Sequence, residues 1–138
     1  MNKGGALVVK TAKAIESGDI QPTPQQEIAE LKSAPKLDRS TGEIHWTRTG
    51  RDIVNLVRGM NPFPGAHTVF QGKNCKLVAV EFHPEIIPDL GVGVWDTDQK
   101  TFLRVGCCDG YINILEWQME GKKRLKIEDF LRGYNFNF

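Results

Sequence analysis

The feature that most constrains the fold is a change in hydrophobic period near His67. From there, apolar and polar residues alternate with a period of two, most clearly from Cys75 to His83. This period is typical of a half-buried β-strand. Further short segments rich in β-branched and aromatic residues make up about five expected strands in all. They lie at 92–95, 102–106 and 111–117.

Turn-forming residues separate these segments, and no helical pattern interrupts them. The separators are 72–74, 84–91, 96–100 and Asp109-Gly110, the last being a strong signal for a tight hairpin. Short consecutive strands of this kind indicate an antiparallel sheet that curls on itself. We therefore expect a mainly β chain with flanking helices, arranged as an OB-like Greek-key barrel. A fragment of a β-sandwich is the alternative.

The first expected helix has no obvious packing partner nearby in the sequence. Apolar residues recur at helical spacing from Gly4 to Ser17, and Gly18 follows as a C-terminal cap. Residues 19–46 are polar and punctuated by prolines, as in a linker. Because so short a helix is marginal alone, we interpret residues 1–18 as the last helix of a larger domain and 47–138 as the barrel domain.

A second helix is expected directly before the strands. Thr49 and Asp52 resemble a capping box, and apolar residues at helical spacing continue to about Gly59. Asn61-Pro62 ends this helix, since proline disfavours helical conformation in the residue before it. The corner RGMNPFPGAHT is expected to place Phe63 against the end of the barrel. A short helical segment is expected at 126–132.

The charge of the whole chain is nearly balanced. Its 138 residues contain 18 Lys and Arg and 17 Asp and Glu, a formal charge of +1. Nucleic-acid binding would therefore depend on local clusters of cations. The sequence has no run of eighteen apolar residues, and its N-terminal segment lacks the pattern of a signal peptide. We expect a cytoplasmic protein without a membrane segment.

The cysteines and histidines do not form a recognisable catalytic or metal-binding pattern. Cys75, Cys107 and Cys108 lack the CxxC spacing of structural zinc sites, and we expect reduced thiols and no metal. No local signature supports a nucleophilic pair of Cys107 or Cys108 with His67 or His83. These two histidines and His45 are interpreted as surface or strand residues.

Five segments of the sequence stand out when they are taken in order: APK at 34–36, GEIHW at 42–46, IVNLVRGMNPFPGAHT at 53–68, DGYINILEWQMEGKKRL at 109–125 and EDFLRGY at 128–134. Together they resemble the C-terminal part of the methionyl-tRNA formyltransferase family. The first helix, GGALVVKTAKAIESG, is also similar to the last helix of that family's N-terminal formyltransferase domain. Asn61-Pro62 favours this family over other 10-formyltetrahydrofolate-dependent enzymes, in which the pair is usually altered.

The resemblance implies an enzyme that formylates the amino group of methionyl initiator tRNA, with 10-formyltetrahydrofolate as donor. In that family the catalytic Asn, His and Asp lie in the N-terminal domain. No catalytic residue and no bound cofactor are therefore assigned to this chain, which is expected to be non-catalytic alone and monomeric. Its implied partners are the initiator methionyl-tRNA and the N-terminal formyltransferase domain. The family usually has Trp at the position of Phe63.

Basic residues are the candidate tRNA contacts, since Lys and Arg suit phosphate oxygens. The densest cluster has four cations in five positions after Gly121. Arg58 and Arg132 have an equal alternative, which is pairing with carboxylates such as Asp52 and Asp129. The full candidate set is Lys32, Lys36, Arg39, Arg58, Lys73, Lys122, Lys123, Arg124, Lys126 and Arg132. The strand aromatics are expected in the core: Phe70, Phe82, Trp95, Phe102, Tyr111 and Trp117.

Two other functions remain open at this point. The chain can be the C-terminal domain of a related formyltransferase or hydrolase whose acceptor is a nucleotide sugar or water. It can also be a free-standing OB-type module that binds a protein or an oligonucleotide. In either case the basic cluster can be a solvated turn balanced by Glu120, Glu128 and Asp129.

Overall fold

The chain falls into two units, Met1–Ala34 and Pro35–Phe138, in a computed structural model that describes residues 2–26 and 33–134. The first unit contains helix α1 (Asn2–Glu16), which forms as expected. Gly18 adopts φ +73°, and its backbone N–H donates to the carbonyl of Ile15 at 3.2 Å. A left-handed residue that closes the last turn is a common helix ending, and glycine adopts it without a steric penalty.

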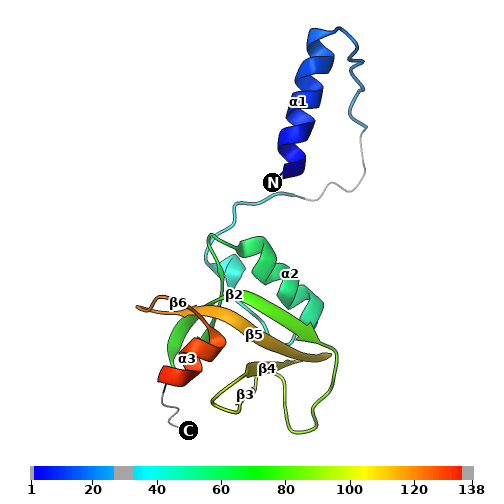
Figure 1. Cartoon of the computed structure of the whole chain (residues 1–138). Coiled ribbons are helices and arrows are strands. Elements are labelled where there is room, and N and C mark those ends of the chain that lie inside the picture. The colour runs from blue at the N-terminus through cyan, green and yellow to red at the C-terminus, as the bar shows by residue number, and fades with distance from the viewer. Residues whose placement is uncertain (1, 27–32, 135–138) are drawn as a thin grey trace. The chain divides into compact units, whose positions relative to one another are not determined.

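The second unit is built on one curled antiparallel sheet (Figure 1). Its strands lie in the order β1-β2-β5-β4-β3, with β6 also paired to β5. β3, β4 and β5 are joined by consecutive hairpins and β2 lies beside β5, which is a Greek-key arrangement. The expected OB-like, mainly β fold is thus confirmed. The bounds are β1 (Ala66–Phe70), β2 (Lys73–His83), β3 (Trp95–Thr97), β4 (Leu103–Cys107), β5 (Gly110–Met119) and β6 (Arg124–Lys126).

The long strand β2 contains an irregularity that the sequence did not indicate. Its pairing with β5 shifts register between Leu77 and Ala79 and again between Ala79 and Val80. A bulge of this kind reverses which residues point to each face. Leu77 is consequently buried before the bulge, whereas Val80 and Phe82 pack on the core after it.

The core lies between the inner face of the sheet and two helices. Helix α2 (Gly50–Met60) buries Ile53, Val57 and Met60 against the sheet. Its first turn is capped as expected, because the Thr49 hydroxyl accepts from the backbone N–H of Asp52 at 3.2 Å. Helix α3 (Ile127–Gly133) lies on the β5 and β6 side (Figure 1).

Aromatic rings fill much of the space under α3. Trp117 is the central ring, with centroids of Phe130 at 4.6 Å and Phe70 at 5.3 Å. Phe70 in turn meets Trp95 edge-on at 4.7 Å. Edge-to-face contacts at these distances are favoured between aromatic side chains. Phe70, Trp95 and Trp117, together with Phe82, thus lie in or against the core as expected.

Phe102 and Tyr111 are corrections to that expectation. Both are only half-buried, and the guanidinium of Arg104 lies 4.5 Å from the ring centroid of Phe102 and 5.2 Å from that of Tyr111. Tyr111 also stacks on His83, with centroids 4.8 Å apart. These rings therefore pack with polar side chains, an arrangement that strand alternation alone does not distinguish from core packing.

Two other expectations on the sheet need adjustment. The segment expected as a strand at 92–95 makes one isolated bridge at Val92, and the strand begins at Trp95. The sequence prediction also omitted β6, which brings the number of strands in the sheet to six. Among the described residues, no helix is long and apolar enough to cross a bilayer.

Candidate functional site

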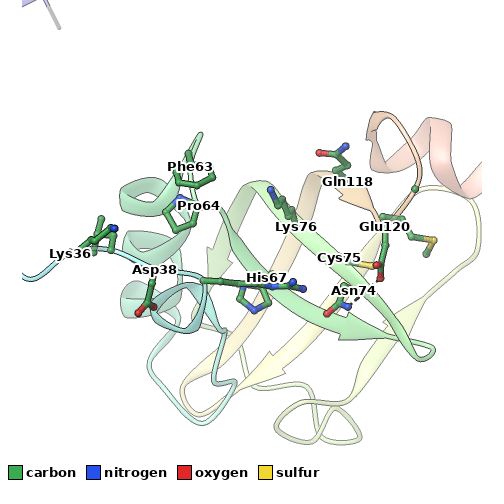
Figure 2. Close-up of a pocket in the computed structure, with 14 residues that line it drawn as sticks. Lys36, Asp38, Phe63, Pro64, His67, Asn74, Cys75, Lys76, Gln118 and Glu120 are labelled. Atoms are coloured by element: carbon green, nitrogen blue, oxygen red, sulfur yellow. Dashed lines mark hydrogen bonds between the residues drawn. The ribbon is translucent and has the colours of Figure 1, made fainter.

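A groove of about 670 Å³ lies over the outer face of the sheet. We call it the outer-sheet groove (Figure 2). Its lining comes from four stretches of chain that are distant in sequence: Lys36 to Arg39; Phe63, Pro64 and His67; Asn74 to Lys76; and Gln118 to Gly121. Figure 2 shows Phe63 and Pro64 to one side of Lys76, with Gln118 and Glu120 to the other. All four stretches belong to the second unit.

Strand register explains how the polar side chains of the floor come together. His67 on β1 pairs with Lys76 on β2, which pairs with Gln118 on β5, which pairs with Arg124 on β6. Directly opposed residues in antiparallel strands project to the same face. Since their sequence neighbours Ala66, Cys75 and Trp117 are buried, this row of four faces outward.

One wall of the groove is the segment that precedes α2. Residues 19–46 were expected to be a linker, yet Ile44 is 5% exposed and belongs to the core. The backbone N–H of Ile44 donates to the carbonyl of His67 at 2.9 Å, and the Trp46 indole donates to the hydroxyl of Thr68 at 3.2 Å. The part of this segment near the barrel is therefore attached to the edge of β1.

Asp38 organises the turn that carries Lys36 and Arg39. One carboxylate oxygen accepts from the hydroxyl of Ser40 at 2.7 Å and from the backbone N–H and hydroxyl of Thr41 at 3.0 and 2.9 Å. These hydrogen bonds, with that of Ser40 the largest cause, lower the pKa of Asp38 from 3.8 to about 2. Asp38 is therefore ionised at neutral pH, and its carboxylate is held in place within the turn.

The Asp38 turn predicts a pH-dependent contribution to stability. Because the pKa of Asp38 is depressed in the folded chain, its contribution is present above about pH 4 and lost as the pH falls toward 2. Asp38→Asn is expected to lower the free energy of unfolding near neutral pH, and the gap from the wild type should close over this acid range. Urea unfolding at several pH values measures the gap. A gap that is constant with pH would contradict this role.

The corner between α2 and β1 places Phe63 where the sequence did not lead us to expect it. Phe63 was expected to lie against the end of the barrel, but its side chain is 81% exposed at the edge of the groove. The corner itself is anchored, since the Asn61 amide donates to the carbonyl of Val78 at 2.7 Å and the Gly65 N–H to that of Met60 at 2.9 Å. With Pro62 and Pro64 on either side, the backbone presents the ring outward.

The opposite wall is the turn between β5 and β6. The backbone N–H of Lys122 donates to the carbonyl of Met119 at 3.0 Å, and the Gln118 side chain donates to the carbonyl of Lys122 at 3.0 Å. Glu120 accepts from the Asn74 amide at 3.2 Å, which joins this turn to the start of β2. The turn therefore has a defined shape, and it carries Lys122 and Lys123 next to the groove.

Arg124 differs from its basic neighbours because its guanidinium has a partner. Its Nε and Nη2 donate to the two carboxylate oxygens of Glu116 at 2.5 and 2.6 Å, across the β5–β6 pair. This pairing lowers the pKa of Glu116 and raises the pKa of Arg124. In the described part of the chain, Lys122, Lys123 and Lys126 make no ion pair.

The remaining candidate cations are distributed more widely. Lys73 is exposed at the start of β2, next to the groove residue Asn74. Arg58 lines a second hollow of about 460 Å³, shared with Arg51 and Glu81 between α2 and β2. Arg132 pairs with Asp129 at 3.1 Å, one of the two arrangements considered for it. Lys32 lies outside the described residues.

Lys36, Arg39 and the basic cluster after Gly121 were predicted from the sequence as binding residues, but three residues of the groove were not. These are Phe63, His67 and Lys76. Lys76 alternates with the buried residues Cys75 and Leu77, and this outward position was the one available signal. Nothing in the sequence indicated that it would face residues 36–39.

The two buried cysteines, Cys75 and Cys107, are not suited to nucleophilic chemistry. Burial raises the pKa of both Cys75 and Cys107 to about 11, so these thiols stay protonated at neutral pH. His83 lies 3.5 Å from a carboxylate oxygen of Glu81. Across residues 2–26 and 33–134, no group of three His, Cys, Asp or Glu side chains is placed to hold a metal ion.

The known proteins whose sequences are similar to this chain are formyltransferases. Residues 36–135 match the family model described as the formyl transferase C-terminal domain. A methionyl-tRNA formyltransferase of Bacteroides fragilis is 38% identical over 98% of this chain, and one of Halothermothrix orenii is 37% identical over 96%. The aligned regions cover 44% and 43% of these proteins, so the chain spans less than half their length.

The fold is also similar to that of a solved structure. HypX from Aquifex aeolicus, crystallised in complex with tetrahydrofolic acid, matches 91% of this chain with a TM-score of 0.62 and 22% identity. The match covers 22% of the HypX chain. At this level of identity the likeness establishes the arrangement of the strands.

Proposed function

Because the chain belongs to the formyl transferase C-terminal domain family, we propose that it is the tRNA-binding part of a methionyl-tRNA formyltransferase. The observation that carries this proposal is the convergence of cations on one face. Lys36 and Arg39 from one wall and Lys76 from the floor line a single groove, and Lys122 follows the lining residue Gly121 in the opposite wall. Cations arranged in this way suit the phosphate backbone of RNA.

The proposed reaction is transfer of a formyl group from 10-formyltetrahydrofolate to the amino group of methionyl initiator tRNA. The names of the relatives support this activity. The catalytic groups would belong to a formyltransferase domain, and this chain would contribute none. Its part in the reaction is to bind the tRNA at a distance from the reacting amino group, so that binding energy is used to position that group.

The electrostatics of the groove fit a polyanion. Asp38 and Glu120 are the carboxylates of the lining, and both already accept hydrogen bonds from protein groups. Lys36 and Lys76, the lysines of the lining, make no ion pair with a described carboxylate. Because the contacts would be to phosphates, affinity should depend strongly on salt and weakly on base sequence.

Helix α1 provides a second line of support for the domain assignment. Its described side chains are exposed apart from the intermediate Ala14, and the exposed ones include Leu7, Val8 and Ile15. An amphipathic helix of this length needs tertiary packing to be stable. We propose that this apolar face packs on the formyltransferase domain of the same enzyme and that the chain is monomeric.

Titration with initiator tRNA at several salt concentrations tests the proposed function. The double substitution Lys122→Ala, Lys123→Ala is expected to weaken binding and to reduce the slope of log K against log salt by roughly 0.7 to 0.9 for each phosphate that is no longer bound. Lys100→Ala is the matched control, because Lys100 is an exposed lysine of the β3–β4 turn that does not line the groove. It should leave the slope nearly unchanged.

Two results would count against the proposal. If tRNA does not bind, the acceptor of a related formyltransferase, such as a nucleotide sugar, becomes the better hypothesis. If tRNA binds but the double variant and the wild type have the same salt slope, the turn between β5 and β6 is not part of the interface.

A further inference from the structure

Phe63 is the most exposed large aromatic side chain among the described residues of the second unit, and it lies at the edge of the outer-sheet groove. Aromatic side chains are usually buried because they carry a large apolar surface. The ring is held outward by a corner with two prolines and two hydrogen bonds to its flanks. A rigid ring exposed in this way is available for stacking.

The groove beside this ring combines apolar and cationic surface. Leu37 and Pro64 supply apolar surface, and the amide side chains of Asn74 and Gln118 can hydrogen-bond to a polar edge. Its volume of about 670 Å³ lies in the range of small-molecule pockets. A flat, partly polar ring system carrying a negative charge matches this combination.

The cations are placed to bind that negative charge. Lys36 and Arg39 line the wall and Lys76 the floor, and none of them makes an ion pair with a described residue. The lining also contains the imidazole of His67, the cross-strand neighbour of Lys76. The three cations of the lining thus outnumber its two carboxylates, Asp38 and Glu120, which already accept hydrogen bonds from protein groups.

We propose that the outer-sheet groove binds one unpaired nucleotide of RNA, with its base stacked on Phe63 and its phosphate held by Lys36, Arg39 and Lys76. This inference rests on the proposed function for the source of the RNA, while the chemistry of the groove stands independently of it. A base in a duplex stem is stacked and paired, and so is not free to enter such a groove. The groove would thus select a loop or a single-stranded end.

The site separates two kinds of contact to one RNA. Lys122 and Lys123, which come directly after Gly121 in the turn, would contact phosphates of the RNA backbone whatever the base sequence. Phe63 would contribute stacking, which tolerates any base but requires it to be unpaired. Substitutions at the two places should therefore have different effects on different RNAs.

The test compares a short single-stranded oligoadenylate with a blunt-ended RNA duplex as probes. Phe63→Ala is expected to weaken oligoadenylate binding roughly 5- to 150-fold and to leave duplex binding nearly unchanged. Phe63→Trp should preserve binding, and the fluorescence of the new indole should be quenched when the oligoadenylate binds. Ile86→Ala is the matched control, because Ile86 is also 81% exposed but does not line the groove.

The outcomes separate this inference from the proposed function. Failure of the oligoadenylate to bind, or equal affinity for the wild type and Phe63→Ala, would overturn the nucleotide site. If tRNA still bound with the salt slope expected for Lys122 and Lys123, the proposed function would stand. Conversely, Phe63-dependent binding of oligoadenylate without affinity for tRNA would support the nucleotide site and reject the proposed function.

Discussion

Replacing Trp117 by alanine is expected to lower the free energy of unfolding by about 3 to 5 kcal/mol. Trp117 is 1% exposed, and it lies among the rings of Phe70, Phe130 and Trp95 with centroid distances of 5.3, 4.6 and 6.4 Å. These neighbours come from β1, α3 and β3. Truncation therefore opens a cavity between these three elements. They cannot easily move to fill it, because each is also held by other interactions.

Urea unfolding followed by far-UV circular dichroism measures this loss. Leu115→Ala is the matched control, since Leu115 lies on the same strand, β5, but is 43% exposed. Its loss should be below about 1 kcal/mol, as for most exposed positions. A Trp117→Ala variant within about 1 kcal/mol of the wild type would show that the aromatic cluster repacks without it.

Gly106→Ala is expected to destabilise the chain by about 2 to 4 kcal/mol, through overpacking and broken hydrogen bonds. A Cβ at this position would overlap the carbonyl oxygen of Gly91 and lie 3.0 Å from that of Leu90. Gly106 also accepts from the Gly93 N–H at 2.9 Å and donates to the Val94 carbonyl at 3.1 Å. The added methyl group would push the β2–β3 connection away from β4 and break both hydrogen bonds.

Thermal and urea unfolding should show a lower midpoint for Gly106→Ala. Gly59→Ala provides a control in the opposite direction, because Gly59 is exposed within α2 and nothing lies within 4 Å of an added Cβ. That substitution should stabilise the chain by about 0.4 to 1 kcal/mol, as expected for alanine in a helix. If both variants were stabilised, the β2–β3 connection would not be held closely against β4.

Local patterns predicted the elements of the fold well where one physical rule dominated. The Thr49 cap and the Asn61-Pro62 stop marked the limits of α2 because capping and proline geometry act within a few residues. The Asp109-Gly110 turn likewise marked the β4–β5 hairpin. The bulge in β2 was missed because the change of face after Leu77 follows from pairing with β5, which local alternation does not contain.

The groove was harder to predict than the fold. Its cations were visible as residue types, but Lys76 reaches the groove through strand register, and Lys36 and Arg39 through the attachment of their segment to β1. Phe63 shows the same limit in another form. An aromatic between two prolines indicates a rigid corner, and only the tertiary structure decides whether the ring points toward the core or toward solvent.

The position of β5 in the sheet determines the order in which the strands of the barrel can pair. It pairs with β2, β4 and β6, so none of these strands can complete its pairing without it. Its central amides should therefore exchange with solvent only when the whole barrel unfolds. During synthesis, β2 must wait for β5 to emerge from the ribosome, and until then its unpaired edge remains available to other chains.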